Sequence, residues 1–253
     1  MQNPISVTRA LAVLDLFGAE SPALGADAIC AMLGCSVPTG YRYIRELVSA
    51  GLLRRLPRAL YGLGPRIVLL DYIMRRTDPL LAAAQPVMRA LADRSGCDCV
   101  LSALYDMQII DTHRETATAP LALAYGRGRP RPLFLGAAPK VILASQPLAF
   151  LRRLHGLLAT EIQQAGLGGD FAAFRAEMTA IRKCGFHISR GELEAELSAV
   201  AAPIPVHDPD LPAAIALVTT SARFDVLNHD ALIAMVRQAA AEIADQLERP
   251  SEE

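Results

Sequence analysis

Ser36-Val-Pro-Thr-Gly-Tyr-Arg-Tyr-Ile-Arg-Glu-Leu-Val-Ser-Ala-Gly-Leu-Leu53 is the stretch that decides the fold of the N-terminal part of the chain. An apolar helical segment ending in Leu33-Gly34-Cys35 precedes it, and Arg54, Arg55 and Leu56-Pro-Arg-Ala-Leu-Tyr-Gly-Leu63 follow. This order predicts a helix, a glycine turn, a second helix and two short strands joined by a turn. A winged helix-turn-helix has that order, so the sequence predicts a module that binds duplex DNA.

The second helix of this module is predicted to have two different faces. Ile44, Leu47 and Val48 recur at helical spacing and predict the face that packs on the core. Ser36 is expected to cap the helix by accepting a hydrogen bond from a backbone N–H of the first turn. Pro38 is tolerated in that turn because its missing N–H would have no partner within the helix.

The outer face of the same helix is predicted to enter the major groove. Arg42 is expected to bind guanine O6 and N7, and Thr39 and Tyr41 are expected to contact a thymine methyl group or a phosphate. For any single arginine a solvated surface role is the simpler reading, but the ordered set favours DNA. The predicted DNA-binding residues are Ser36, Pro38, Thr39, Tyr41, Arg42, Arg45, Arg55 and Arg58.

The wing and the charge distribution support this reading. Leu52–Leu56 and Ala59–Leu63 are β-prone runs, and Arg58 lies at the turn between them, within reach of the DNA backbone. Residues 1–66 hold seven arginines against four carboxylates, a net charge of +3, whereas the whole chain carries −1. The basic excess is thus confined to the end that is predicted to meet phosphates. Because a net charge of +3 is modest, we expect tight binding to need two such modules on one DNA.

Length and composition bound the remaining possibilities. A chain of 253 residues predicts two domains, and its 52% hydrophobic content is ample for a core. No stretch of about 20 apolar residues predicts a membrane span, and the N-terminus lacks a signal-peptide pattern. Five cysteines, an odd number, argue against a disulfide framework. We therefore expect a cytoplasmic protein with no membrane partner.

Hydrophobic periodicity and Pro/Gly punctuation predict the elements. Helices are expected at 6–17, 26–33, 36–50, 66–76, 78–94 (kinked or divided at Pro86), 133–144, 148–158, 169–184 and 225–248. Strands are expected at 52–56, 59–63, 99–104, 107–113, 186–190, 197–204 and 213–219. The mixture predicts an α+β protein with a winged helix-turn-helix at 1–65, a linker helix at 66–78, a sensor domain at 79–248 and a polar tail at 249–253.

Several short motifs, in order, resemble one known family. They are Val7-Thr-Arg-Ala-Leu-Ala-Val-Leu14, Pro38-Thr-Gly-Tyr-Arg-Tyr-Ile-Arg-Glu-Leu47, Tyr61-Gly-Leu-Gly-Pro65, Pro132-Leu-Phe-Leu-Gly-Ala-Ala-Pro-Lys140, Gly185-Phe186, Glu192 and Ala201-Ala-Pro-Ile204. Together they are similar to the isocitrate-lyase-regulator (IclR) family of bacterial transcription regulators, over nearly the whole chain. The resemblance implies a winged helix, a linker helix and a GAF-like domain that binds a small effector. It also implies a homodimer, or a dimer of dimers, on a pseudo-palindromic operator.

The resemblance also implies where an effector binds, and here the chain departs from the family pattern. Ala137, Ala138 and Pro139 occupy a turn that is usually rich in Thr, Ser and Gly. Ala216 and Val218 replace small hydroxyl residues on the last strand, Ser189 stands where an acidic residue is common, and Ala199 where cysteine is common. The implied effector-binding residues are Leu135, Ala137, Ala138, His187, Ser189, Arg190, Ala199, Ala216 and Val218.

Loss of those polar groups predicts an aromatic or otherwise hydrophobic carboxylate as effector, because an unmatched carboxylate is costly to desolvate. Arg190 or His187 is the expected anchor for its acidic group, and the alternative for Arg190 is a solvated surface charge. Arg127, Arg129 and Arg131 predict a basic loop that either flanks the pocket mouth or is solvated. Whether the effector releases a repressor, assists one or acts on an activator is left open.

Three other functions are alternatives to a DNA-binding regulator that senses a small molecule. Cys97, Cys99, His113 and Cys184 would suit a redox-responsive or metal-responsive regulator, although Cys97 and Cys99 lack the two-residue spacing of a zinc knuckle. The sequence has no nucleophile elbow, P-loop, His-Glu-x-x-His or dinucleotide fingerprint, so we expect no enzyme, no catalytic residue, no metal ligand and no cofactor. A winged helix that contacts protein rather than DNA is the remaining alternative.

Overall fold

The computed structural model describes residues 5–117, 121, 127–205 and 212–249. The chain divides into two compact units, Met1–Asp78 and Pro79–Glu253, and each is described by itself. The predicted tail at 249–253 lies outside the described residues except for Arg249, which follows the last helix.

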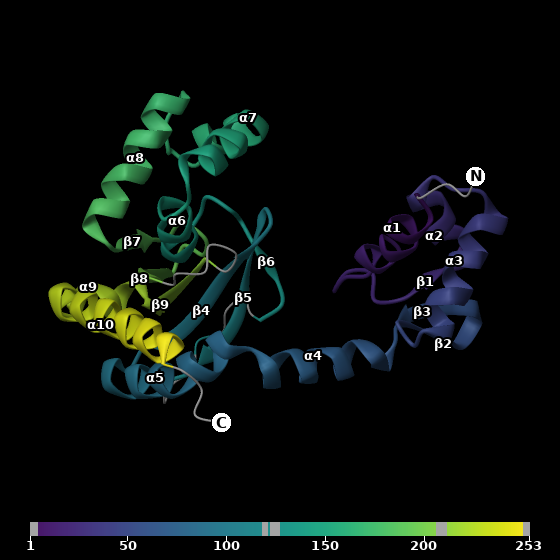
Figure 1. Cartoon of the computed structure of the whole chain (residues 1–253), viewed down its shortest axis with the longest axis horizontal. Coiled ribbons are helices and arrows are strands. Elements are labelled where there is room, and N and C mark those ends of the chain that lie inside the picture. Colours follow the sequence, from purple (N-terminus) through teal and green to yellow (C-terminus); the bar gives the residue numbers. More distant parts are fainter. Residues whose placement is uncertain (1–4, 118–120, 122–126, 206–211, 250–253) are drawn as a thin grey trace. The chain divides into compact units, whose positions relative to one another are not determined.

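The first unit is a winged helix (Figure 1). Its elements are α1 (Ile5–Leu11), a 3-10 turn (Leu14–Leu16), β1 (Leu24–Gly25), α2 (Ala26–Leu33), α3 (Val37–Ser49), β2 (Leu53–Leu56), β3 (Leu60–Leu63) and α4 (Pro65–Thr77). The three strands form an antiparallel sheet in the order β1-β3-β2. The first helix is shorter than the predicted 6–17, because the chain tightens into the 3-10 turn after Leu11.

The helix-turn-helix depends on Gly34 at the end of α2. Gly34 has φ 60°, a left-handed conformation that glycine adopts without steric cost. The turn lets Ile44 and Leu47 of α3 pack with Ile29 of α2, and all three are buried. The 3.6-residue spacing that predicted the core face of α3 therefore matches its packing.

The chain crosses itself closely where β3 leads into α4. The Gly64 N–H donates to the Leu52 carbonyl oxygen at 2.8 Å, and the Arg66 N–H donates to the Gly51 carbonyl oxygen at 3.2 Å. A Cβ atom on Gly64 would lie 2.1 Å from that Gly51 oxygen. Only glycine fits here, and the contact fixes the start of α4.

The second unit contains a six-stranded antiparallel sheet in the order β6-β5-β4-β9-β8-β7. Its strands are β4 (Asp98–Tyr105), β5 (Gln108–Glu115), β6 (Pro130–Arg131), β7 (His187–Arg190), β8 (Leu197–Ile204) and β9 (Ala213–Thr220). Its helices are α5 (Pro79–Ser95), α6 (Ala137–Ala144), α7 (Leu148–Gln164), α8 (Phe171–Cys184), α9 (Ser221–Val226) and α10 (His229–Glu248). Within the described residues, no helix is both long and apolar enough to cross a bilayer.

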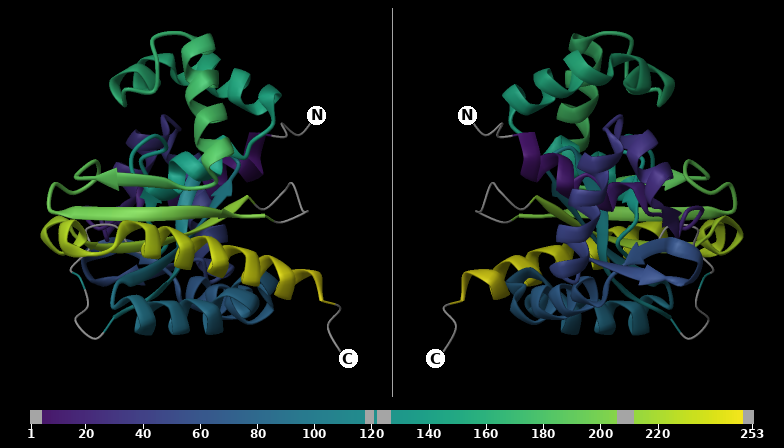
Figure 2. Two further views of the ribbon diagram at one scale, coloured as in Figure 1. Left: turned by 90° about the vertical axis from the view of Figure 1, so that its left-hand side faces the viewer. Right: turned by 90° about the vertical axis from the view of Figure 1, so that its right-hand side faces the viewer.

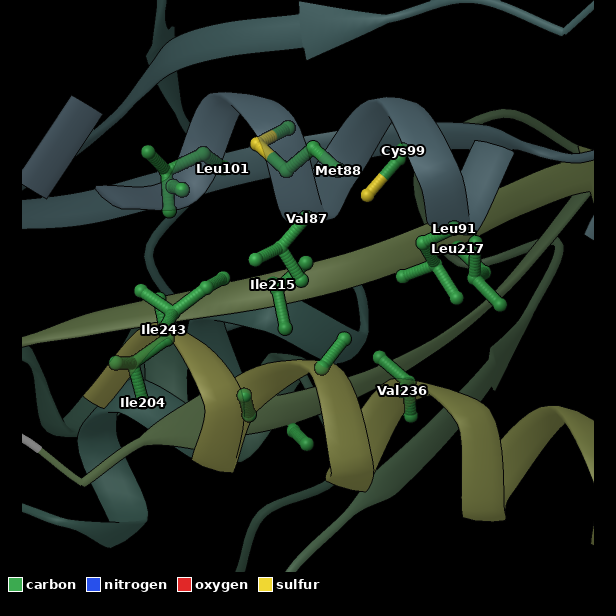
Figure 3. Close-up of a cluster of buried hydrophobic side chains, with 14 of the residues drawn as sticks. Val87, Met88, Leu91, Cys99, Leu101, Ile204, Ile215, Leu217, Val236 and Ile243 are labelled. Carbon is green, nitrogen blue, oxygen red and sulfur yellow. The ribbon is translucent and has the colours of Figure 1, made fainter. Parts of the chain in front are cut away.

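Helices cover both faces of this sheet, and Figure 2 shows the strands between the two helical layers. On one face α5 and α10 pack against alternate strand residues, as Figure 3 shows. The labelled side chains of this core are Val87, Met88, Leu91, Cys99, Leu101, Ile204, Ile215, Leu217, Val236 and Ile243. On the other face the intervening residues, among them Val100, Ala216 and Val218, belong to a second core with α6, α7 and α8. Strand alternation thus divides the domain into two separate cores.

Further predicted helices also differ from the structure. The predicted helix at 133–144 begins only at Ala137, because Gly136 has φ 93° and cannot continue a right-handed helix. α5 runs through Pro86 without division. The predicted helix at 225–248 is two helices, because Leu227 is extended and the Asn228 side chain accepts a hydrogen bond from the Ala231 N–H to begin α10.

A buried carboxylate, that of Asp98, lies at the first residue of the central strand β4. Asp98 is 1% exposed and pairs with the guanidinium of Arg114. Its carboxylate also accepts from the backbone N–H groups of Ala117 at 2.9 Å and Leu121 at 3.2 Å. One side chain therefore binds Arg114 on β5 and the backbone of Ala117 and Leu121.

Candidate nucleic-acid interface and ligand pocket

The outer face of α3 is a continuous exposed stripe. Pro38, Tyr41, Arg42 and Arg45 recur at i, i+3, i+4 and i+7, and all four are exposed. The stripe lies opposite the buried Tyr43, Ile44 and Leu47. The Arg42 guanidinium carbon lies 5.7 Å from the Tyr43 ring centroid, and the Arg45 side chain reaches Glu46 at 3.3 Å in an exposed pair that contributes little to stability.

The first turn of α3 differs in one contact from the prediction. Ser36 occupies the N-cap position, but its side chain makes no cap hydrogen bond to the backbone. Its hydroxyl instead donates to the Thr39 hydroxyl at 3.0 Å, and Thr39 is half-buried. The predicted capping contact is therefore wrong. The backbone N–H groups of this first turn also have no partner further back in the helix, as at any helix start.

The wing presents three exposed arginines, Arg54 and the two predicted DNA contacts. Arg55 lies on β2, and Arg58 lies in the turn between β2 and β3 with φ 61°. Both side chains are exposed. The neighbouring Ala59 also has a positive φ of 56°, so the tip is a tight left-handed turn.

A cavity lies at the start of α6, between the sheet and the segment that joins β7 to β8. It encloses about 530 Å³ when the part open to solvent is included. Six of the residues implied by the resemblance line it: Ala137, Ala138, Ser189, Ala199, Ala216 and Val218. Val100 and Leu197 add further apolar wall, so most of the lining is aliphatic.

Three implied residues do not line this cavity. Leu135 lines a separate groove with Phe134 and Leu158. His187 is the first residue of β7, and its Nε2 atom lies 4.0 Å from a Glu192 carboxylate oxygen. Arg190 is half-exposed, pairs with Asp225 and stacks over the Phe224 ring. Because Ser189 faces the cavity, its neighbour Arg190 points to the other face of the sheet, so the structure does not support Arg190 as an anchor in the cavity.

A lysine and a glutamate join α6 to the loop after β7. The Lys140 ammonium donates to Glu192 Oε2 at 2.7 Å, and the backbone N–H of Gly136 donates to the same oxygen at 2.9 Å. Burial, and then the nearby Lys140 charge, lower the pKa of His187 from its ordinary value. The lowered pKa favours the neutral imidazole, which is poorly suited to hold an anion.

A second ion pair, which the sequence analysis did not predict, lies in the cavity wall. Arg131 on β6 donates from Nη1 to Asp111 Oδ1 at 3.2 Å, and Asp111 also accepts from the Ser102 hydroxyl at 2.7 Å. A β-bulge opposite Leu101 and Ser102 pairs Ser102 with Asp111 and leaves Thr112 unpaired. Asp111 lies two residues after Ile109 on β5, so strand alternation places both on the cavity side of the sheet. A carboxylate at that position was the available signal, since a buried charge needs a partner.

The four residues proposed for redox or metal sensing are not brought together. Cys97 and Cys99 are buried on the α5 side of the sheet, where burial raises the pKa of both thiols. Cys184 is exposed at the end of α8, a helix that packs in the other core. His113 pairs with Glu115 at 2.8 Å. Among the described residues, no group of three His, Cys, Asp or Glu side chains could hold a metal ion.

Comparison with known families matches both units. Residues 6–57 match the model of the IclR helix-turn-helix domain. Residues 74–245 match the model described as bacterial transcriptional regulator IclR C-terminal.

Curated relatives and solved structures agree. The chain is 28% identical to the HTH-type transcriptional regulator KipR of Bacillus subtilis, over 98% of this chain and 99% of KipR. It is 28% identical to XynR of Escherichia coli, over 87% and 88% of the two chains. An IclR transcriptional regulator from Silicibacter sp. TM1040 has a TM-score of 0.81 at 24% identity, covering 97% of each chain. An IclR homolog from Microbacterium hydrocarbonoxydans, complexed with 4-hydroxybenzoate, has a TM-score of 0.75 at 20% identity, over 96% and 98%. The two solved structures show a shared fold.

Proposed function

This chain belongs to the IclR family of bacterial transcriptional regulators, and we propose that α3 and the wing contact its operator while the cavity at the start of α6 binds its effector. The family consists of regulators and not of enzymes. The observation that carries the DNA part of the proposal is the exposed stripe of α3, because a recognition helix needs base-reading side chains opposite its buried face.

Arg42 is the proposed base-reading residue. It lies in the first half of α3, and its guanidinium can donate two hydrogen bonds to one guanine. Arg58 at the wing tip is the proposed phosphate contact, and Arg55 lies on the strand beside it. The two roles differ physically, because a base contact reads sequence whereas a phosphate contact is independent of it.

We expect Arg42→Ala to weaken binding to the preferred DNA by about 1–3 kcal/mol and to relax the preference at one base pair. Arg58→Ala should weaken binding to all sequences alike and reduce the slope of log K against log salt by about 1. Arg9→Ala removes an exposed arginine of α1 and is the matched control. The measurement is fluorescence anisotropy on a site enriched from random duplexes, at several salt concentrations. An unchanged sequence preference in Arg42→Ala would contradict this assignment of the recognition helix.

A homodimer is part of the same proposal. Helix α4 has no buried residue, and it exposes Val68 (72%), Tyr72 (59%) and Met74 (61%) beside Leu69, Leu70 and Ile73. Exposed apolar side chains of that number on one helix are typical of an interface. A second copy is the proposed partner, because two half-sites on one operator require two winged helices. The enriched DNA tests this directly: two symmetric half-sites support it, and a single half-site speaks against it.

The proposed effector is an aromatic or hydrophobic carboxylate. The cavity supports it because Val100, Ala199 and Val218 offer aliphatic surface to a ring. The charged residues of the lining are Asp111, Arg131, Glu192 and Glu194. The complex of the Microbacterium homolog with 4-hydroxybenzoate supports the same class. An effector of this kind would regulate by binding the DNA-competent and DNA-incompetent arrangements with different affinity.

Thermal unfolding against a panel of acids tests the effector class. A ligand at about 100 times its dissociation constant should stabilise the folded state by about 2.7 kcal/mol. We expect benzoate or 4-hydroxybenzoate to raise the unfolding temperature and glyoxylate or pyruvate to leave it unchanged. The small acids have too little apolar surface to contact the aliphatic side chains of the cavity. The active acid should then change the DNA affinity. A shift with glyoxylate or pyruvate alone would reject the hydrophobic class.

A further inference from the structure

We propose that Arg131 is the residue that binds the carboxylate of the effector, and that Asp111 and Ser102 position it. This inference rests on the proposed function of the cavity. It replaces the anchors that the sequence suggested, since Arg190 and His187 do not line the cavity.

The first support is the place of Arg131. It comes from the two-residue edge strand β6, paired with β5 through Ile109, and its side chain is only 11% exposed. It lines the cavity beside Gly136 and Ala137, the first residues of α6. Arg127 and Arg129, by contrast, are exposed. Of the three arginines in this basic segment, Arg131 is thus the one that lines the cavity.

The second support is the set of hydrogen bonds that its guanidinium makes. Nη1 donates to both oxygens of Asp111, at 3.2 and 3.4 Å. Nε is buried and has no hydrogen-bond partner within the part of the chain that the structure describes. A guanidinium presents five N–H donors in a rigid fork, and a buried donor without an acceptor is costly. A carboxylate in the cavity would supply that acceptor.

The third support is the arrangement that holds Arg131. Asp111 is 3% exposed and is itself held by the Ser102 hydroxyl at 2.7 Å. Strand alternation from Ile109 places Asp111 on the cavity side of β5. Asp111 occupies only Nη1, so it fixes the guanidinium and leaves Nε for a ligand. The Nη2 atom lies near Gly136, 3.5 Å from where a Cβ atom on that residue would be, which is an ordinary van der Waals distance.

The other cations near α6 are already engaged. Lys140 donates to Glu192 at 2.7 Å, and that carboxylate also takes the Gly136 N–H. Arg190 pairs with Asp225 on the far face of the sheet. Among the described residues, Arg131 is therefore the cation that lines the cavity and has a buried N–H donor, Nε, without an acceptor.

The test compares an acid with its neutral analogue on two variants. Dissociation constants of 4-hydroxybenzoate and 4-hydroxybenzamide are measured by calorimetry for the wild type, Arg131→Gln and Arg190→Gln. We expect Arg131→Gln to lose at least about tenfold in affinity for the acid, since hydrogen bonds to a charged group are the strong ones, and to change less for the amide. Arg190→Gln should bind both ligands like the wild type.

A second variant guards against misfolding. Arg131→Gln leaves Asp111 without its cation, so the pair Arg131→Gln/Asp111→Asn removes both charges together and should show the same selective loss. Equal affinity for the acid in the wild type and in these variants would overturn the role of Arg131 while leaving the proposed effector class intact. A wild type that binds neither ligand nor benzoate would instead reject that effector class, and with it this inference.

Discussion

Replacing Gly64 by alanine is expected to unfold the winged-helix unit selectively, with a loss of about 3 kcal/mol or more, at the upper end of overpacking effects. The added Cβ would lie 2.1 Å from the Gly51 carbonyl oxygen and 2.9 Å from the Leu53 carbonyl carbon. Both are backbone atoms, so no side-chain rotation relieves the clash. Separating them breaks the Gly64 to Leu52 and Arg66 to Gly51 hydrogen bonds that fix the start of α4.

Scanning calorimetry measures this effect, because the two compact units have separate hydrophobic cores and we expect separate transitions. For a unit of this size each kcal/mol lowers the midpoint by about 4–8 °C. Gly18→Ala is the matched control in the same unit, since a Cβ there meets nothing within 4 Å. We expect the control to keep the midpoint and DNA affinity of the wild type, and Gly64→Ala to lose both. A variant Gly64→Ala with an unchanged midpoint would show that the crossing is not as tight as the structure has it.

Asp98→Ala should destabilise the second unit by about 3–5 kcal/mol, as expected when one member of a buried ion pair is removed. The carboxylate is 1% exposed, and it neutralises Arg114 and accepts from the N–H groups of Ala117 and Leu121. Alanine would leave a charge and two backbone donors without their acceptor. Urea unfolding followed by circular dichroism measures the loss as a lower midpoint.

Asp225→Ala is the control for this measurement. Its carboxylate also pairs with an arginine, but the two side chains of the Arg190 pair are 51% and 58% exposed. Solvent screens such a pair, so its loss should cost no more than about 1 kcal/mol. If the two variants unfolded at the same urea concentration, burial would not be what makes Asp98 important.

Local sequence signals predicted the winged helix well. The spacing of Ile44 and Leu47 and the position of Gly34 depend only on neighbours in the chain, and α2 has the predicted bounds of 26–33. The resemblance to the IclR family is confirmed by the two matching domain models, and so is the α+β class. Two of the predicted helices were too long, because Gly136 and Asn228 each lie at the boundary where a helix begins.

The cavity could be predicted only in part. Small residues at Ala199 and Ala216 were assigned to it by the resemblance, and they line it. Strand alternation could have excluded Arg190, because its neighbour Ser189 was already assigned to the cavity. Arg131 was predicted to lie in a basic loop that either flanks the pocket mouth or is solvated, and local signals could not decide between the two. Its partner Asp111 is 20 residues away in the sequence, so the ion pair has no local signature.

The division of the sheet into two faces has a consequence for how this regulator can evolve or be engineered. Ala216 and Val218 face the cavity, while Ile215 and Leu217 between them belong to the core against α5 and α10. Substitutions that enlarge or shrink the cavity can therefore accumulate on one side while the packing on the other side is preserved. New ligand specificities should be selectable from libraries at Val100, Ala199, Ala216 and Val218, which makes the domain a starting point for biosensors.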